Sequence, residues 1–114
     1  MTTIYGIPNC DSMKKARKWL DAHGVEYRFH NYKKDGLSRE LLLEWVEELG
    51  WESLLNKRGM MWRKLDAARK ASIDRDSAIH IMLETPSIIK RPLLDTGQGL
   101  HLGFSDKDYQ AIFG

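Results

Sequence analysis

The only cysteine of the 114-residue chain, Cys10, is the residue with the clearest capacity for chemistry. It stands where a short run of strand-forming residues, Thr3-Ile4-Tyr5, is broken by Gly6 and Pro8-Asn9 and followed by a helical pattern from Asp11. At the first turn of a helix, unpaired backbone N–H groups and the positive end of the helix dipole stabilise an anion. The sequence therefore predicts a reactive thiol with a lowered pKa.

Charged neighbours act on a Cys10 thiolate in opposite directions. The adjacent carboxylate of Asp11 disfavours a second negative charge, so we expect the pKa to be lowered but not to an extreme. Positive charge comes from the basic residues of the following helix: Lys14, Lys15, Arg17 and Lys18. The alternative is that Cys10 is a small buried apolar residue, as many lone cysteines of intracellular domains are.

Composition limits the class of protein. With 42% hydrophobic and 30% charged residues, the chain is typical of a folded globular protein, and its length suits a single domain over residues 1–114. A net charge of +2 is small for a nucleic-acid binder that works by charge alone. One cysteine cannot form an internal disulfide, and the N-terminus has no charged leader followed by a long apolar run, so we expect a cytoplasmic protein without a membrane span.

The N-terminal third predicts a βαβ unit. A helix is expected from about Asp11 to His23, with Gly24 in the usual position after its C-terminus. Val25–Tyr32 alternates between apolar and polar residues, which is typical of a half-buried strand. Strand, helix and strand within about 30 residues form a βαβ unit, so the two strands should be parallel.

The middle of the chain, from about residue 37 to 85, has only helical patterns. Ser38 and Glu40 begin a helix that Gly50 closes. Lys57-Arg58-Gly59 breaks the pattern. The other expected helices are a short one at Trp51–Leu55, a weak one at Trp62–Ala71 and a longer one at Asp74–Glu84.

After Thr85-Pro86 the residues favour strands again. Strand-forming runs occur at Ile88-Ile89, Arg91–Asp95 and Leu100–Gly103, and the last two flank a glycine turn, which predicts a β-hairpin. Ser105 then caps a final helix that ends at Phe113. A βαβ half, a helical insertion and a ββα half make an α/β protein with a thioredoxin-like mixed sheet.

Three segments carry a resemblance to a known family: I-Y-G-I-P-N-C-D-S-M-K-K-A, L-L-N-K-R-G, and I-I-K-R-P-L-L-D followed by the glycine-bearing hairpin. Over essentially its whole length, the chain resembles the glutathione- and glutaredoxin-coupled arsenate reductases and their relatives, Spx and the YffB-type proteins. Its length and the combination Y-G-I-x-N-C-D are most similar to the YffB-type members.

The resemblance implies roles for individual residues. Cys10 corresponds to the catalytic nucleophile, Arg91-Pro92 to an arginine that precedes a cis-proline, and Asn56-Lys57-Arg58 to a basic site in the helical insertion. The residues implied in binding substrate or glutathione are Arg91, Pro92, Arg58, Lys57, Asn9, Asp11 and Ser12. From the residues alone, Arg91 could be an ordinary surface arginine, but its place at the start of a strand next to the expected thiol favours the site. Lys57 and Arg58 could equally be solvated loop residues.

The chain departs from the family pattern at three places. Arsenate reductases have a histidine where this chain has Gly6 and a small hydroxyl residue where it has Met13, the position of a second cysteine in Spx. A third arginine after the hairpin glycine is also missing, with His101 and Phe104 in its neighbourhood. These differences leave open whether the natural substrate is arsenate, another oxyanion or a disulfide. His101 is a further candidate for orienting the site.

A lone thiol restricts the mechanism. Any adduct on Cys10 must be released by an outside thiol, for which glutathione is the first candidate and glutaredoxin the second. We therefore predict a glutathione-dependent thiol reductase that acts as a monomer with glutathione as cosubstrate. We expect no bound cofactor, no nucleic acid and no metal, since the four histidines lack metal-ligand spacing. The alternative is a Spx-like regulatory binding module without turnover.

Overall fold

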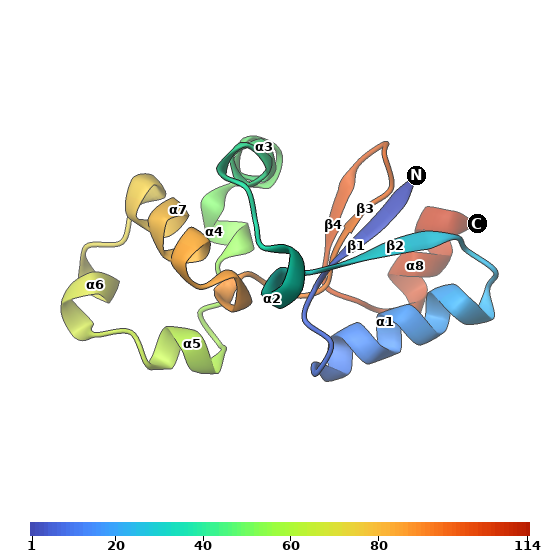
Figure 1. Cartoon of the computed structure of the whole chain (residues 1–114), viewed down its shortest axis with the longest axis horizontal. Helices are drawn as coiled ribbons and strands as arrows, with labels where there is room; N and C mark the ends of the chain where they lie inside the picture. Colours follow the sequence, from blue (N-terminus) through green and yellow to red (C-terminus); the bar gives the residue numbers. More distant parts are fainter. The chain divides into compact units, whose positions relative to one another are not determined.

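The computed structural model describes residues 1–114, which divide into two compact units. One unit comprises Met1–Asp35 and Arg91–Gly114, and the other comprises Gly36–Lys90 (Figure 1). The first contains every strand and the second is helical. No helix in either unit combines the length and the apolar composition needed to cross a membrane.

A four-stranded mixed sheet forms the centre of the first unit. Its order is β2-β1-β3-β4, with β1 parallel to β2 and antiparallel to β3, and with β3 antiparallel to β4. The strands are β1 (Thr2–Gly6), β2 (Tyr27–Asn31), β3 (Leu93–Asp95) and β4 (Leu100–Leu102). The predicted parallel βαβ unit and the C-terminal hairpin are therefore confirmed. This is the thioredoxin-like mixed sheet that the order of elements predicted.

Two helices cover one face of this sheet, α1 (Asp11–Ala22) and α8 (Asp106–Phe113) (Figure 1). Helix α1 ends where predicted, because Gly24 adopts a φ of 67° that favours glycine. Helix α8 begins where predicted, because the Ser105 side chain accepts a hydrogen bond from the Asp108 backbone N–H at 3.0 Å.

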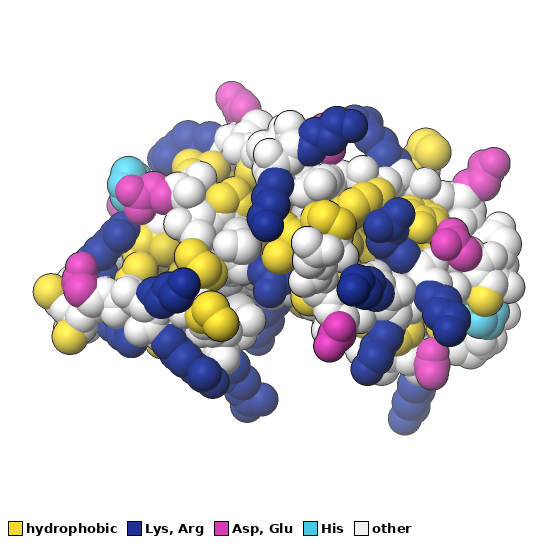
Figure 2. Space-filling model, turned by 60° about the horizontal axis from the view of Figure 1, so that its bottom comes forward, with side chains coloured by type: hydrophobic (Ala, Val, Ile, Leu, Met, Phe, Trp, Pro, Cys, Tyr) yellow, Lys and Arg dark blue, Asp and Glu magenta, His cyan; other side chains and the backbone are white.

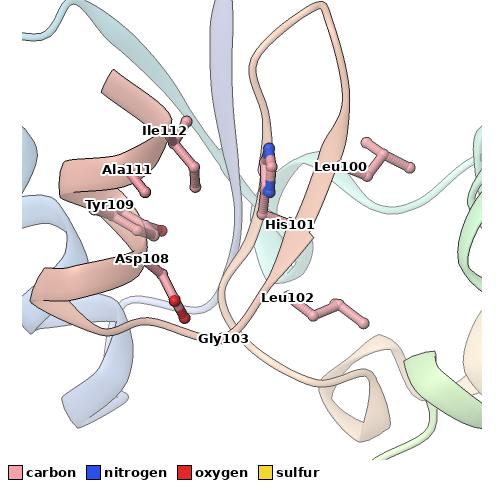
Figure 3. A pocket seen from close by; sticks show the side chains of 8 residues that line it. All are labelled: Leu100, His101, Leu102, Gly103, Asp108, Tyr109, Ala111 and Ile112. Carbon is pink, nitrogen blue, oxygen red and sulfur yellow. The ribbon is translucent and has the colours of Figure 1, made fainter. Parts of the chain in front are cut away.

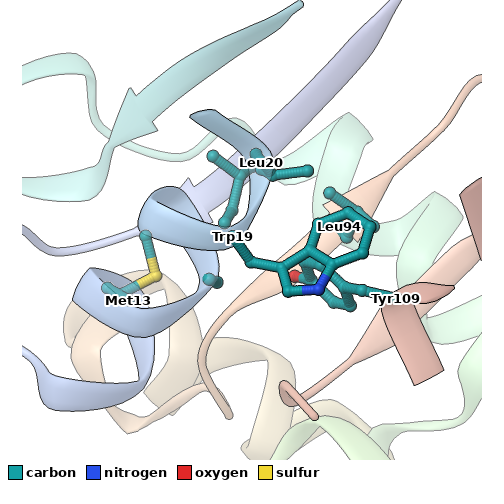
Figure 4. Close-up of a cluster of buried hydrophobic side chains, with 7 residues drawn as sticks. Met13, Trp19, Leu20, Leu94 and Tyr109 are labelled. Carbon is teal, nitrogen blue, oxygen red and sulfur yellow. The ribbon is translucent and has the colours of Figure 1, made fainter. Parts of the chain in front are cut away.

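The core of this unit lies between the sheet and the two helices (Figure 4). Trp19 of α1 and Tyr109 of α8 meet edge to face, with ring centroids 5.5 Å apart. Tyr109 is completely buried, and burial raises the pKa of its phenol. The buried members of the cluster are Ile4, Met13, Ala16, Trp19, Leu20, Leu94 and Tyr109. The close packing of α1 against β1 fixes the start of that helix, where Cys10 is located.

The second strand is shorter than the alternating pattern suggested. Tyr32 was expected in the strand, but it begins the one-turn helix α2 (Tyr32–Asp35). Two side chains redirect the backbone there: the Asn31 amide oxygen accepts from the Lys33 N–H at 3.0 Å, and the Asp35 carboxylate accepts from the Asn31 N–H at 3.2 Å. Such side-chain hydrogen bonds compete with strand pairing.

The second unit is the predicted all-helical insertion. Its helices are α3 (Arg39–Leu49), α4 (Trp51–Leu54), α5 (Met60–Arg63), α6 (Ala67–Ala71), α7 (Arg75–Glu84) and the 3₁₀ turn η1 (Pro86–Ile88). The single weak helix expected over Trp62–Ala71 is two helices, because Asp66 leaves the helical conformation and caps α6 by accepting from the Arg69 N–H at 2.8 Å.

The prediction of a strand at Ile88-Ile89 is also wrong. Pro86 occupies the first turn of η1, a position that suits its fixed φ and missing N–H. Ile89 forms an isolated antiparallel bridge with Leu55, and both side chains are buried in the helical unit. The apolar run is therefore a core segment of this unit, with no strand on either side.

Candidate active site

Cys10 is the N-cap residue of α1, the position predicted from the sequence. Its backbone is extended, and its carbonyl oxygen accepts the first helical hydrogen bond from the Lys14 N–H at 2.9 Å. The side chain is half-buried and packs against the core cluster of the strand-containing unit. The thiol is thus exposed enough to react while one side rests on apolar residues.

The Cys10 thiol has a lowered pKa, and the causes oppose one another. Partial burial raises the pKa, since the thiolate loses solvation. The larger combined effect comes from hydrogen bonds that the Met13 N–H, the Arg91 side chain and the Ser12 N–H donate to the thiolate, and from the Arg91 charge. Backbone amides at a helix start and one guanidinium therefore stabilise the thiolate, which is the reactive form of cysteine.

Arg91 reaches the thiol because it precedes β3, the strand next to β1. The bond between Arg91 and Pro92 is cis, as predicted. Pro92 is buried, and its carbonyl oxygen accepts from the Gly103 N–H at 2.9 Å, so the hairpin holds this turn in place. The structure thus brings together Cys10 and Arg91, two residues 81 positions apart in the chain.

The other residues predicted beside the thiol contribute less. The side chains of Asn9, Asp11 and Ser12 are all exposed at the start of α1. Ser12 acts on the thiolate through its backbone N–H. The lysines of α1 lie on its exposed face: Lys14, Lys15 and Lys18. The positive charge that the sequence assigned to this cluster is supplied in the structure by Arg91.

Lys57 and Arg58 belong to the helical unit. The Lys57 ammonium lies over two aromatic rings, 5.9 Å from the Trp51 centroid and 5.5 Å from the Trp62 centroid. The Arg58 side chain is exposed, and its backbone N–H donates to the Asn56 side-chain oxygen at 3.1 Å. Lys57 is thus held by cation–π contacts within its own unit.

Sequence reasoning missed an aromatic group beside Arg91. Tyr5 of β1 and Tyr32 of α2 are 8% and 4% exposed, and their stacked rings have centroids 6.5 Å apart. Burial raises the pKa of the Tyr32 phenol and the Tyr5 phenol adds to this, whereas the Arg91 charge acts against it. His30 lies 4.9 Å from Tyr5, between ring centroids. Once the parallel register pairs Tyr5 with His30, the two rings become neighbours on one face of the sheet.

The two departures from the family pattern at Gly6 and Met13 are one structural feature. Met13 is completely buried, and its thioether covers the Cα of Gly6. A methyl group on Gly6 would overlap the Met13 sulfur and lie 2.9 Å from its Cε. A side chain at position 6 and a long side chain at position 13 therefore exclude each other.

The position of His101 does not fit the predicted role beside the thiol. It lies on β4 and projects toward α8, where it lines a cavity of about 410 Å³ with Asp108, Ala111 and Ile112 (Figure 3). The groups that act on the thiolate are Met13, Arg91 and Ser12. The expectation that His101 orients the site has no support in this geometry.

Comparisons with known proteins agree with the fold and show the family. The ArsC family model matches residues 5–112. A solved structure named YFFB (PA3664) protein is 48% identical, covers 100% of both chains and superposes with a TM-score of 0.95. An arsenate reductase (ArsC) related protein from Brucella melitensis is 47% identical, with a TM-score of 0.81 over 98% of this chain and 93% of that chain. The global transcriptional regulator Spx of Streptococcus mutans is 31% identical over 98% of this chain and 82% of its own length. The chain belongs to the ArsC family.

Proposed function

We propose that this protein is a glutathione-dependent thiol reductase with Cys10 as its nucleophile. The observation that carries the proposal is the half-buried Cys10 thiol with a lowered pKa, held by the Met13 and Ser12 amides and by Arg91 in a chain that has no second cysteine. A thiolate with a fixed cation beside it suits attack on an electrophile that carries negative charge.

The reaction with a disulfide balances without a second protein thiol. The Cys10 thiolate attacks the glutathionyl sulfur of a mixed disulfide between glutathione and a substrate thiol, the disulfide bond breaks, and the substrate leaves as thiolate. The product is a mixed disulfide between Cys10 and glutathione. A glutathione thiolate, or a glutaredoxin as the second candidate, then attacks the glutathionyl sulfur, and Cys10 leaves as thiolate. Its lowered pKa makes it a good leaving group in this step.

Arg91 has two proposed tasks in this cycle. It stabilises the Cys10 thiolate before attack, and its guanidinium is suited to a glutathione carboxylate. Pro92 fixes the backbone beside it. The remaining proposed glutathione contacts follow from the resemblance: Lys57, Arg58, Asn9, Asp11 and Ser12. Truncating each of these in turn would show which of them affects glutathione binding.

Intact-mass spectrometry with glutathione disulfide tests the proposal. The protein should gain one glutathione at Cys10, and Cys10→Ser should remain unmodified. Arg91→Ala should slow adduct formation by roughly 5- to 150-fold, the equivalent of about 1–3 kcal/mol for a charge-assisted contact. Arg28→Ala, which removes one exposed positive charge from β2, is the matched control and should react at the normal rate.

Two results would count against the reductase. One is an adduct that forms no faster than on an unstructured cysteine peptide, and the other is a rate that Arg91→Ala does not change. Either result would favour a regulatory binding module, for which the 31% identity to Spx is the supporting observation. Turnover assays across arsenate, other oxyanions and disulfides, with glutathione present, separate an enzyme that prefers one substrate from a binding module that turns over none.

A further inference from the structure

Residues 56–77 of the helical unit do not contain a single buried side chain. Helices α5 and α6 lie within this stretch, and neither buries any residue. Apolar side chains nevertheless occur there and are left partly or fully accessible: Met60, Met61, Trp62, Leu65 and Ile73. Met60 is 67% exposed, which is high for a large apolar residue. One exposed and four half-buried apolar residues in a segment without a buried side chain are consistent with an interaction surface.

The same segment carries most of the positive charge of its unit. Residues 57–70 contain six Lys or Arg residues and one Asp, a net charge of +5 within 14 residues, whereas the whole chain carries +2. Arg69 is paired with Glu84 at 2.8 Å, and Asp66 is engaged as the cap of α6. Arg63 and Lys64 are exposed and form no ion pair. Dark blue basic side chains project at many points of the face seen in Figure 2.

Side chains of the segment contact one another although none of them is buried. Two ammonium groups lie over the Trp62 ring, with Lys57 Nζ at 5.5 Å and Lys70 Nζ at 5.8 Å from its centroid. The Lys70 ammonium also donates to the Arg63 carbonyl oxygen at 3.4 Å. These contacts hold the basic and apolar groups in a fixed pattern, which reduces the entropy that a partner would have to overcome.

We propose that the surface formed by residues 57–73 docks an acidic segment of a partner protein, one in which apolar side chains alternate with carboxylates. The carboxylates would pair with Arg63 and Lys64, and the apolar side chains would cover Met60 and Leu65. The flexible thioether of methionine suits such contacts. This surface lies on the helical unit and includes Lys57 and Arg58, which are also proposed glutathione contacts. The contacts assigned to the partner use other residues and do not depend on the proposed reductase activity.

The aromatic contacts favour a protein partner over single-stranded nucleic acid. Binding of bases depends on open aromatic faces on which they can stack. Lys57 and Lys70 already lie over the ring of Trp62, and Lys57 also lies over the ring of Trp51.

A membrane surface does not fit this segment either. Helices α5 and α6, at four and five residues, are too short for the continuous amphipathic helix that lies in a membrane interface.

Fluorescence anisotropy with the full chain tests the proposal. The probe is a labelled synthetic peptide of alternating Glu and Leu residues with one Phe, and the comparison peptide has Gln in place of every Glu. The Glu peptide should bind and the Gln peptide should not. Binding should weaken strongly as salt rises from about 0.1 M to about 1 M, because exposed charges are screened.

Two variants locate the surface. Arg63→Glu with Lys64→Glu should weaken binding of the Glu peptide by at least roughly tenfold. Arg28→Glu with Lys34→Glu makes the same change of charge on exposed residues of the other unit and should have little effect. Met60→Ser should also weaken binding, without a change in charge. Circular dichroism confirms that each variant is folded.

Three outcomes would overturn the proposal. Equal loss of binding in both charge-reversal pairs would mean that only bulk charge matters. Equal binding of the Gln peptide would remove the electrostatic argument. Tighter binding of a single-stranded oligonucleotide than of the Glu peptide would assign the surface to nucleic acid. Arg58 is left unchanged in every variant, so failure here says nothing about glutathione binding.

Discussion

The contact between Gly6 and Met13 gives a sharp test of how the site is built. Gly6 does not adopt a positive φ, so its backbone suits any L-residue. An alanine at such a position would ordinarily stabilise a protein by about 0.4–1 kcal/mol, because it restricts the unfolded chain. At Gly6, however, the added methyl group would overlap the Met13 sulfur. Met13 is completely buried in the same cluster as Ile4 and Ala16, so its thioether can move aside only by displacing close-packed neighbours.

We therefore expect Gly6→Ala to destabilise the protein by about 1–3 kcal/mol, the usual cost of overpacking a core. Met13→Ala should cost about 2–5 kcal/mol, because it leaves a cavity in the same place. In the double variant the methyl group at position 6 enters the space that the thioether vacated. The two losses should then fail to add, with a coupling of about 0.5–3 kcal/mol.

Urea unfolding followed by tryptophan fluorescence measures these free energies. Trp19 is 8% exposed, lies in the same core cluster as Met13 and is the only tryptophan of this unit, whereas the other three tryptophans report on the helical unit. Gly99→Ala is the matched control. A methyl group there has no neighbour nearer than 3.8 Å, and Gly99 also lacks a positive φ. If Gly6→Ala costs no more than Gly99→Ala, or if the double variant is additive within about 0.3–0.5 kcal/mol, the reasoning is refuted.

Three further predictions follow from single contacts. Because the pKa of Cys10 is lower in the folded protein, stability should rise with pH until the pKa of the unfolded chain, about 8.5, is passed, and Cys10→Ser should lack this rise in urea titrations. The Arg69 hydrogen bond lowers the pKa of Glu84, so this pair stabilises the fold at neutral pH and ceases to do so in acid. Glu84→Gln should therefore reduce the loss of unfolding free energy as the pH falls. Ser105→Ala removes the hydrogen bond to Asp108 and should cost about 1 kcal/mol in thermal or urea unfolding.

The fold was predictable where local signals agree with the packing. Ser38 and Ser105 begin helices as expected, and Gly24 and Gly50 end them with positive φ. The predictions were wrong where pairing decided the outcome. Ile88-Ile89 has the composition of a buried strand, yet Ile89 pairs only with Leu55 through a single bridge. Nothing in a short apolar run indicates whether a neighbouring strand exists.

The site was predictable for the nucleophile and less so for its surroundings. The prediction of a lowered Cys10 pKa rested on the helix start, and this cause is partly confirmed, since the Met13 and Ser12 amides do act on the thiolate. Lys14 and Lys15, which the prediction also invoked, do not contribute to the lowered pKa. They are exposed, while Met13 and Ala16 on either side of the pair face the core, so the helical period alone places these lysines toward solvent.

Arg91 lies near two acidic side chains of different kinds, a thiol and a buried phenol. Its charge acts on both the Cys10 thiol and the Tyr32 phenol, but burial keeps the pKa of that phenol far above neutrality. At neutral pH the phenol is therefore uncharged, and of these two groups only the thiolate offers Arg91 a negative charge. Formation of a mixed disulfide removes that charge and leaves the half-buried guanidinium with one anionic neighbour fewer. A carboxylate of the bound glutathione can replace it, so the proposed adduct restores the charge balance that its own formation disturbs.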